Sequence, residues 1–147
     1  MKTAGKKNPS GTSGGNAYAQ SRHRNRNEVS EDYVELIDDM IARSGEARAV
    51  DLARALGVSH VTVSKTVRRL IESGLVLSEP YRSIFLTEKG KSLASKSRER
   101  HETVRRCLVA IGVPDGTADI DAEGIEHHAS EATLQAMRDF LKRDDRA

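Results

Sequence analysis

The chain has 147 residues, of which 31% are charged and 37% hydrophobic, and its formal net charge is +2. Aromatic residues make up only 3% and tryptophan is absent, which disfavours a large β-sandwich or β-barrel. No apolar run approaches the ~18 residues of a membrane span, and the polar start lacks a secretory segment. Because the single cysteine, Cys107, cannot close an internal disulfide, we expect a soluble protein of a reducing cytoplasm.

The small net charge conceals a segregation of charge along the chain. Residues 1–27 carry a net charge of +6, residues 28–46 carry −6, residues 47–106 carry +7 and residues 115–147 carry −5. This alternation favours a central segment that binds an anion, with acidic segments on either side that could hold a cation. Ordinary solvated helix surfaces would give the same pattern. Charge alone therefore does not distinguish binding surfaces from solvated ones, and the motifs are needed.

The beginning of the chain is rich in Gly, Ser, Asn, Lys and Arg and nearly lacks large apolar side chains. Such a segment buries too little surface to repay the cost of ordering, so we predict a flexible basic arm over residues 1–28. Ser30 then has the character of an N-cap, and Gly45 predicts the end of the helix that follows it. The apolar residues of this helix recur at helical spacing; they are Tyr33, Leu36, Ile37, Met40 and Ile41.

A helix-turn-helix pattern follows. A short helix ends at Gly57, and Ser59 caps a second helix that ends before Gly74. The residues expected on the buried face of the second helix are Val63, Val67, Leu70 and Ile71. Two β-prone runs over residues 75–79 and 83–87 then predict a hairpin. The combination is typical of a winged helix-turn-helix.

The second helix of this motif has the composition of a DNA recognition helix. With its apolar face inward, basic side chains can neutralise phosphates, Thr can reach base edges, and Val can touch a thymine methyl group. A plain helical bundle can show the same helix–Gly–helix pattern, but the hairpin and the basic middle segment favour DNA binding. The residues that we expect to contact DNA are Ser59, Val61, Thr62, Lys65, Arg69 and, in the hairpin loop, Arg82.

The rest of the chain predicts three more helices. A helix over residues 88–111 would be about 36 Å long and suits a connector between two functional ends. The Pro-Asp-Gly sequence at residues 114–116 breaks it. Helices over residues 118–128 and from Ser130 onward follow. The predicted fold class is therefore mainly α with a small β-hairpin.

Acidic and histidine side chains cluster outside the recognition helix. Acids at i, i+3 of the first helix share one face, as do two acids and a histidine at i, i+3, i+4 of the helix containing EGIEHH. A further histidine lies along the apolar stripe of the long helix. Each feature alone is usually a solvated acid or a core histidine, but together they could converge, and buried acids repel one another without a cation. The six residues are Asp32, Glu35, His101, Glu123, Glu126 and His127.

A site of carboxylates and imidazoles without a thiolate suits a divalent ion such as Mn²⁺ or Fe²⁺. Four carboxylates are more than one ion needs, so we interpret the pattern as a two-metal site with a bridging glutamate. Two-metal sites also catalyse hydrolysis, so a two-metal hydrolase is an alternative, although the sequence contains no nucleophile motif or phosphate loop. A metal-independent winged-helix factor with merely solvated acids is another.

Four stretches of the sequence resemble the MntR family of manganese transport regulators, in the diphtheria-toxin-repressor superfamily. They are EDYVELIDDMIARSGEARAVDLARALGVSHVTVSKTVRRL, PYRSIFLTEKG, RERHETV and DAEGIEHHASEATL, and the resemblance covers about residues 30–143. It implies a homodimeric winged-helix repressor of manganese-uptake genes, with a C-terminal helical dimerisation domain and two Mn²⁺ ions per subunit. It assigns as metal ligands Asp32, Glu35, His101, Glu123, Glu126 and His127.

The resemblance also distinguishes between metals and orders the domains. Iron-responsive relatives typically have Met at the position of Asp32 and a Cys among the ligands, so Mn²⁺ is favoured over Fe²⁺; an iron-responsive regulator of the same superfamily is the alternative. The implied domains are a winged helix-turn-helix over residues 29–92 and a helical metal-binding and dimerisation domain over residues 93–147. The expected partners are palindromic operator DNA and a second copy of the chain, with no membrane and no small-molecule substrate.

Overall fold

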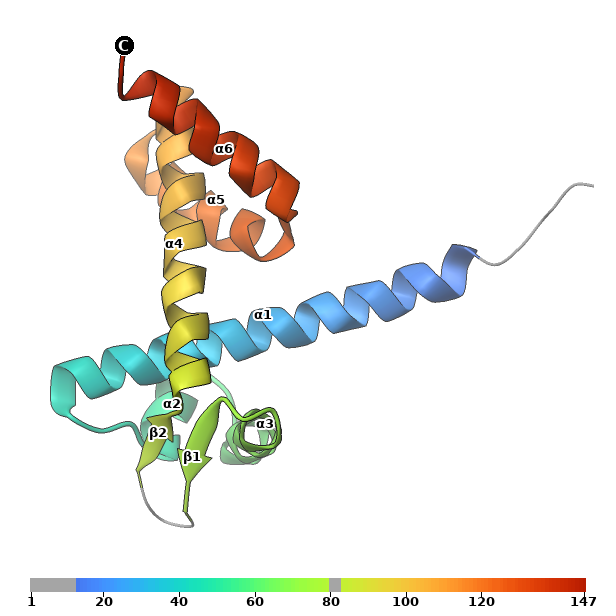
Figure 1. Cartoon of the computed structure of the whole chain (residues 1–147). Coiled ribbons are helices and arrows are strands. Elements are labelled where there is room, and N and C mark those ends of the chain that lie inside the picture. Colours follow the sequence, from blue (N-terminus) through green and yellow to red (C-terminus); the bar gives the residue numbers. More distant parts are fainter. Residues whose placement is uncertain (1–12, 80–82) are drawn as a thin grey trace, which may run out of the picture.

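The computed structural model describes residues 13–79 and 83–147, in which two packed regions are joined by one long helix (Figure 1). The elements are α1 (Ser13–Ser44), α2 (Ala49–Leu56), α3 (His60–Glu72), β1 (Val76–Ser78), β2 (Ile84–Leu86), α4 (Glu88–Ala110), α5 (Asp115–His128) and α6 (Glu131–Asp144). This arrangement confirms the predicted fold class, mainly α with a small hairpin. Within the described residues, no helix combines the length and the apolar character needed to cross a membrane.

The first region packs around one hydrophobic core. Helices α1, α2 and α3 and the hairpin all contribute to it, with Val34, Ile37, Leu52, Leu70 and Ile84 almost completely buried. Burial of a side chain of this size stabilises the fold by about 1.5–3 kcal/mol. The shared core therefore fixes the orientation of α3 relative to α1.

The helix-turn-helix forms as the sequence predicts. Gly57 adopts a φ of 65°, in the left-handed region that glycine tolerates, and so lets the chain turn between α2 and α3. The backbone N–H of Thr62 donates to Ser59 Oγ at 3.2 Å, which caps α3. One prediction is wrong: Ile71 is 41% exposed, because it lies at the rim of the apolar face. The rest of that predicted face, Val63, Val67 and Leu70, is buried.

The predicted hairpin is also confirmed, with strands shorter than expected. β1 and β2 pair antiparallel, with Val76 opposite Leu86 and Ser78 opposite Ile84. The backbone N–H of Ile84 donates to the carbonyl of Ala47 at 2.8 Å, so the hairpin is attached to the connection between α1 and α2. This hairpin, the wing of the motif, is thus fixed relative to α1 and α2.

Helix α1 starts much earlier than predicted. It runs from Ser13, so the prediction of a flexible arm is wrong for residues 13–28, while residues 1–12 lie outside the described part of the chain. Ser30 is an interior helical residue, whose hydroxyl donates to the carbonyl of Arg26 at 2.9 Å. The physical reason is that extension of a helix costs little once nucleation has been achieved by a packed segment. Figure 1 shows the added turns projecting away from both packed regions.

Helix α4 belongs to both regions. Ala94 is buried in the first core, whereas Val104 is buried in a second core with Ala122 and Leu134 from α5 and α6. Between the cores, the guanidinium of Arg98 donates to Asp38 Oδ2 at 2.6 Å and to Asp39 Oδ1 at 2.7 Å. These contacts hold α4 against α1. The acidic and histidine side chains described next lie around this crossing.

Gly90 provides a test of the junction between the wing and α4. A Cβ at this position would lie 2.0 Å from the backbone oxygen of Leu75, and backbone cannot move aside as a flexible side chain can. We expect Gly90→Ala to destabilise the protein by about 1–3 kcal/mol, measured by urea denaturation. Gly116→Ala is the matched control, because the Cβ there meets nothing within 4 Å. A Gly90→Ala variant as stable as this control would contradict the packing described here.

Candidate metal centre and DNA-binding surface

Five of the six predicted metal-binding residues form two groups of three where α1, α4 and α5 meet. In each group, one ligand atom from every residue lies within 4.8 Å of the others. Glu123 belongs to both groups, and the i, i+3, i+4 spacing on α5 places it on the same helix face as its two neighbours. Each group could hold a cation, and the two groups share one carboxylate. The groups are Asp32, Glu123 and His127, and His101, Glu123 and Glu126.

Each imidazole turns one nitrogen toward the acids of these two groups. His127 Nε2 lies 3.2 Å from Asp32 Oδ1 and 3.5 Å from Glu126 Oε1. His101 Nδ1 lies 3.3 Å from Glu123 Oε2 and 3.6 Å from Glu126 Oε2. The two rings therefore face a common set of acids with Nε2 in one case and Nδ1 in the other.

Two of these polar atoms are buried without a hydrogen bond. Among the described residues, neither Glu126 Oε2 nor His127 Nε2 has a hydrogen-bonding partner, and the two side chains are only 1% and 2% exposed. An unsatisfied buried polar group costs about 1–3 kcal/mol, and more if it is charged. Both atoms point to the centre of the acidic cluster, so a cation there would satisfy them. The residues fit a divalent metal ion.

The electrostatics of the cluster reflect an excess of acids. Burial raises the pKa of Glu126 to about 7, with nearby Glu123 and Glu35 acting in the same direction. The neighbouring carboxylates of Asp32 and Glu31 raise the pKa of His127 to about 10. Protons thus neutralise part of the repulsion that a bound cation would neutralise.

Glu35, the sixth predicted ligand, belongs to neither group of three. Burial raises the pKa of Glu35, as do the neighbouring charges of Glu123 and Asp32, while Ser97 and Arg98 act against the shift. The side chain therefore lies beside the cluster, within its field.

Three residues around the cluster were not predicted. Glu31 Oε2 lies 2.7 Å from His127 Nδ1, and Arg100 Nη2 lies 2.6 Å from the same carboxylate oxygen. Asp119 Oδ1 lies 3.0 Å from Nε2 of His101. The sequence signal was helical spacing: Glu31 precedes Glu35, and Asp119 precedes Glu123, by one helical turn.

The predicted DNA-contacting side chains lie on an exposed surface of α3 and its cap. Val61 is 64% exposed, and Lys65 and Arg69 are exposed on the same helix. Ser59 and Thr62 are exposed as well, although their hydroxyl groups lie 3.0 Å apart and contribute to the cap. Arg82 lies outside the described residues. The surface has the chemistry for phosphate and base contacts.

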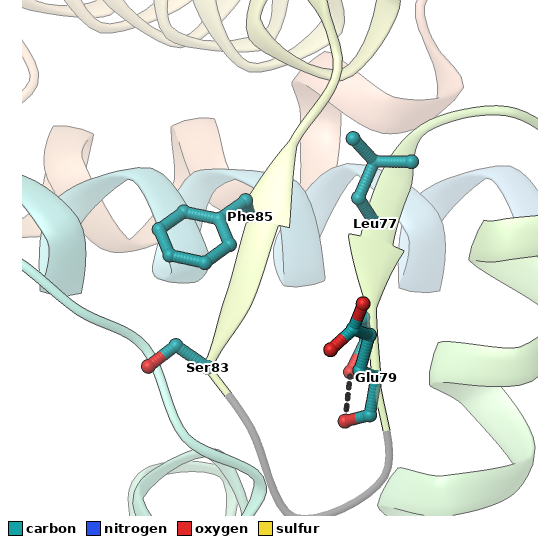
Figure 2. Close-up of a pocket in the computed structure, with 5 residues that line it drawn as sticks. Leu77, Glu79, Ser83 and Phe85 are labelled. Carbon is teal, nitrogen blue, oxygen red and sulfur yellow. Dashed lines mark hydrogen bonds between the residues drawn. The ribbon is translucent and has the colours of Figure 1, made fainter.

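The outer face of the wing is apolar. Leu77 and Phe85 are 60% and 49% exposed, and with Ser83 and Glu79 they line a shallow cavity of about 420 Å³ (Figure 2). The cavity lies on the hairpin, away from the histidine and acid cluster. The wing surface and the candidate metal centre are thus separate features.

Two family profiles match this chain. One describes the N-terminal DNA-binding domain of iron-dependent repressors and matches residues 27–84. The other describes the metal-binding and dimerisation domain of iron-dependent repressors and matches residues 87–146.

Curated relatives and solved structures agree with the profiles. The transcriptional regulator MntR of Escherichia coli O157:H7 is 49% identical over 86% of this chain and 81% of its own length. The HTH-type transcriptional regulator MntR of Bacillus subtilis is 38% identical over 76% of this chain and 79% of its own length. The structure of the manganese regulator SloR aligns with a TM-score of 0.66 at 27% identity, over 77% of this chain and 53% of that one. IdeR of T. acidophilum gives 0.64 at 27% identity, over 76% and 53%, so this chain spans about half of these structures.

The raised pKa of Glu126 predicts how the stability of the metal-free protein depends on pH. Because this pKa, about 7, exceeds the ordinary value of 4.5, the stabilisation is complete below pH 4.5 and is lost as pH rises through 7. The loss is at most about 1.4 kcal/mol per pH unit. His127, whose pKa rises from 6.5 to about 10, acts in the same direction above pH 6.5. Thermal unfolding in a chelator should therefore show falling stability from pH 5 to 8.

Glu126→Gln should flatten this profile, since glutamine does not titrate. Glu99→Gln, an exposed glutamate on α4, is the control and should leave the slope unchanged. Equal slopes for Glu126→Gln and the parent protein would show that Glu126 is not protonated in the folded state.

Proposed function

This chain belongs to the iron-dependent repressor family, and from that premise we propose that it is a repressor activated by Mn²⁺. Both domains of the family are present, so the protein is a metal-dependent, DNA-binding transcriptional regulator that forms a homodimer, and not an enzyme. The alternative of a two-metal hydrolase is thereby excluded. We propose further that it acts in the bacterial cytoplasm on palindromic operators of manganese-uptake genes.

One observation carries the choice of manganese: the cluster consists only of carboxylates and imidazoles. Hard oxygen ligands with imidazole suit Mn²⁺, whereas a thiolate or thioether would favour softer ions. Cys107 lies outside both groups of three, and burial raises the pKa of its thiol. A solved structure described as a manganese-dependent transcriptional repressor in complex with manganese, 28% identical to this chain, supports the same choice. Regulation by Fe²⁺ is the weaker candidate.

We assign two ions to each subunit because the two groups of three share Glu123. Asp32 and His127 would hold one ion, His101 and Glu126 would hold the other, and Glu123 would bridge them. We assign Glu35 as a further ligand, reached by a rotation of its side chain. Metal ions supply positive charge here and no reaction chemistry.

The ligands couple the two regions because they come from both. Asp32 lies on α1, which shares its core with α3, whereas His101 and Glu123 lie on α4 and α5. Bound ions would neutralise the repulsion among these carboxylates, so that α1 packs against α4 and α5 in one orientation. In a dimer, this orientation sets the separation of the two recognition helices, which must match the ≈34 Å repeat of B-DNA.

The dimer interface that we propose lies on the far side of α5. Ile125 is 37% exposed, and with Gly124 and Ala129 it lines a mostly apolar hollow of about 630 Å³. Exposed apolar surface of this kind marks interaction sites. The family's dimerisation domain includes this helix.

The direct test is binding to a DNA fragment from a manganese-transporter promoter, measured by fluorescence anisotropy with Mn²⁺, Fe²⁺, Zn²⁺ or Co²⁺. We expect tight binding with Mn²⁺ and weak binding in a chelator. Binding that ignores every metal would overturn the proposal, and a response to Fe²⁺ alone would replace manganese by iron.

Basic residues of α3 should contribute to DNA affinity without affecting the metal. Lys65→Ala and Arg69→Ala each remove one phosphate contact, so the slope of log K against log salt should fall by about one unit. The Mn²⁺ isotherm should not change. Lys142→Ala, a charge removed from exposed α6, is the control. Parent-like DNA binding by both α3 variants would mean that another surface contacts the operator.

Asp32 should determine the preference for manganese. Asp32→Met replaces a hard, charged ligand by a soft, neutral one, and Met is a good helix former. We expect lower Mn²⁺ affinity and a relative shift toward Fe²⁺ or Co²⁺. His101→Ala, by contrast, removes a ligand and should weaken the DNA response to all of these ions. Operator binding against free metal measures both, and identical curves for Asp32→Met and the parent would contradict the assignment.

A further inference from the structure

Glu31 is a buried carboxylate at the centre that belongs to neither group of three. It comes from α1, where its side chain is 11% exposed, and its Oε2 lies 2.7 Å from Nδ1 of His127. The opposite nitrogen of that ring, Nε2, faces Asp32 at 3.2 Å and Glu126 at 3.5 Å. Glu31 thus contacts the side of the imidazole that the candidate ligands do not use.

Arg100 on α4 holds Glu31 in turn. Its Nη2 lies 2.6 Å from Glu31 Oε2, and its side chain is 26% exposed. The ion pair balances a charge that would otherwise add to the acidic cluster. Arg100, Glu31 and His127 therefore form a continuous chain of polar contacts through α4, α1 and α5.

We propose that Glu31, fixed by Arg100, is a positioning residue that orients His127 and commits its Nε2 to the metal. A carboxylate accepts a hydrogen bond only from a protonated nitrogen, so it fixes the proton of the neutral ring on Nδ1 and leaves the Nε2 lone pair free. The proposal rests on the metal site proposed above. Glu31 would then be a further link between the two regions, because it lies on α1 and orients His127, a ligand on α5.

The second imidazole provides an internal comparison. Asp119 Oδ1 lies 3.0 Å from Nε2 of His101, on the side of the ring away from the other acids. Asp119 is 66% exposed, whereas Glu31 is 11% exposed. Water can take the place of an exposed acceptor but not readily that of a buried one. We therefore expect Glu31 to matter more for metal binding than Asp119.

The first experiment measures Mn²⁺ binding to the full chain by titration calorimetry. Glu31→Leu removes the acceptor and should weaken one of the two ions by about 10–100-fold, the usual effect of losing an outer partner of a ligand. Glu31→Gln keeps a carbonyl acceptor and should recover part of this affinity. Asp119→Asn should change the affinity by less than about threefold. Asp145→Asn breaks a similar pair with Arg106 on α4, far from the centre, and should have no effect.

The second experiment reads the ring directly. In the Zn²⁺-loaded protein, long-range ¹H–¹⁵N correlation spectra should show His127 protonated on Nδ1 and metal-bound through Nε2. Glu31→Leu should yield mixed signals from both forms, which a purely structural role would not produce. If Glu31→Leu does not fold, Glu31→Gln and Arg100→Gln take its place in both measurements.

The outcomes separate this inference from the proposed function. A parent protein that binds no Mn²⁺ overturns the metal site itself. A parent that binds two ions, with Glu31 variants that show the same affinity and the same His127 spectrum, overturns the positioning role alone.

Discussion

Repulsion among acids brought together by three helices is the constraint on which the rest of this structure depends. Asp32, Glu123 and Glu126 converge beside two imidazoles, and two of the buried polar atoms there have no partner among the described residues. Such a cluster is stable only if protons or a cation neutralise it. The stability of this junction therefore depends on the pH and on the cations in solution. The stability of the hydrophobic cores on either side of it does not.

Because α4 is one continuous helix, a change at the acidic cluster affects both packed regions. The helix is buried in the first core at Ala94 and in the second at Val104, so neither end can rotate alone. Arg98 secures it to α1 through Asp38 and Asp39, independently of the acidic cluster. The Arg98 ion pairs and the acidic cluster thus lie side by side on the same pair of helices, and in our proposal only the acidic cluster responds to metal.

Local patterns in the sequence were sufficient to predict most of the fold. Ser59 and Ser130 cap α3 and α6 as expected, because a cap is a contact between residues three apart. The grouping on α5 was predictable for the same reason. The contact of Glu31 with His127 was not, since the two residues are 96 positions apart in the chain, and a contact between distant helices leaves no local pattern. The start of α1 was missed because composition describes a segment's own tendency and not its attachment to a stable helix.

The two faces of α5 have a consequence for how the metal affinity of the protein depends on its concentration. Glu123 and Glu126 lie on one side of this helix, and Ile125 with its apolar hollow lies on another. If metal binding favours the orientation of this helix that self-association needs, the two equilibria are thermodynamically linked, and each strengthens the other. Apparent metal affinity then rises with the concentration of the protein itself. A cell could set its threshold for the metal through the amount of regulator that it makes, without any change in the ligands.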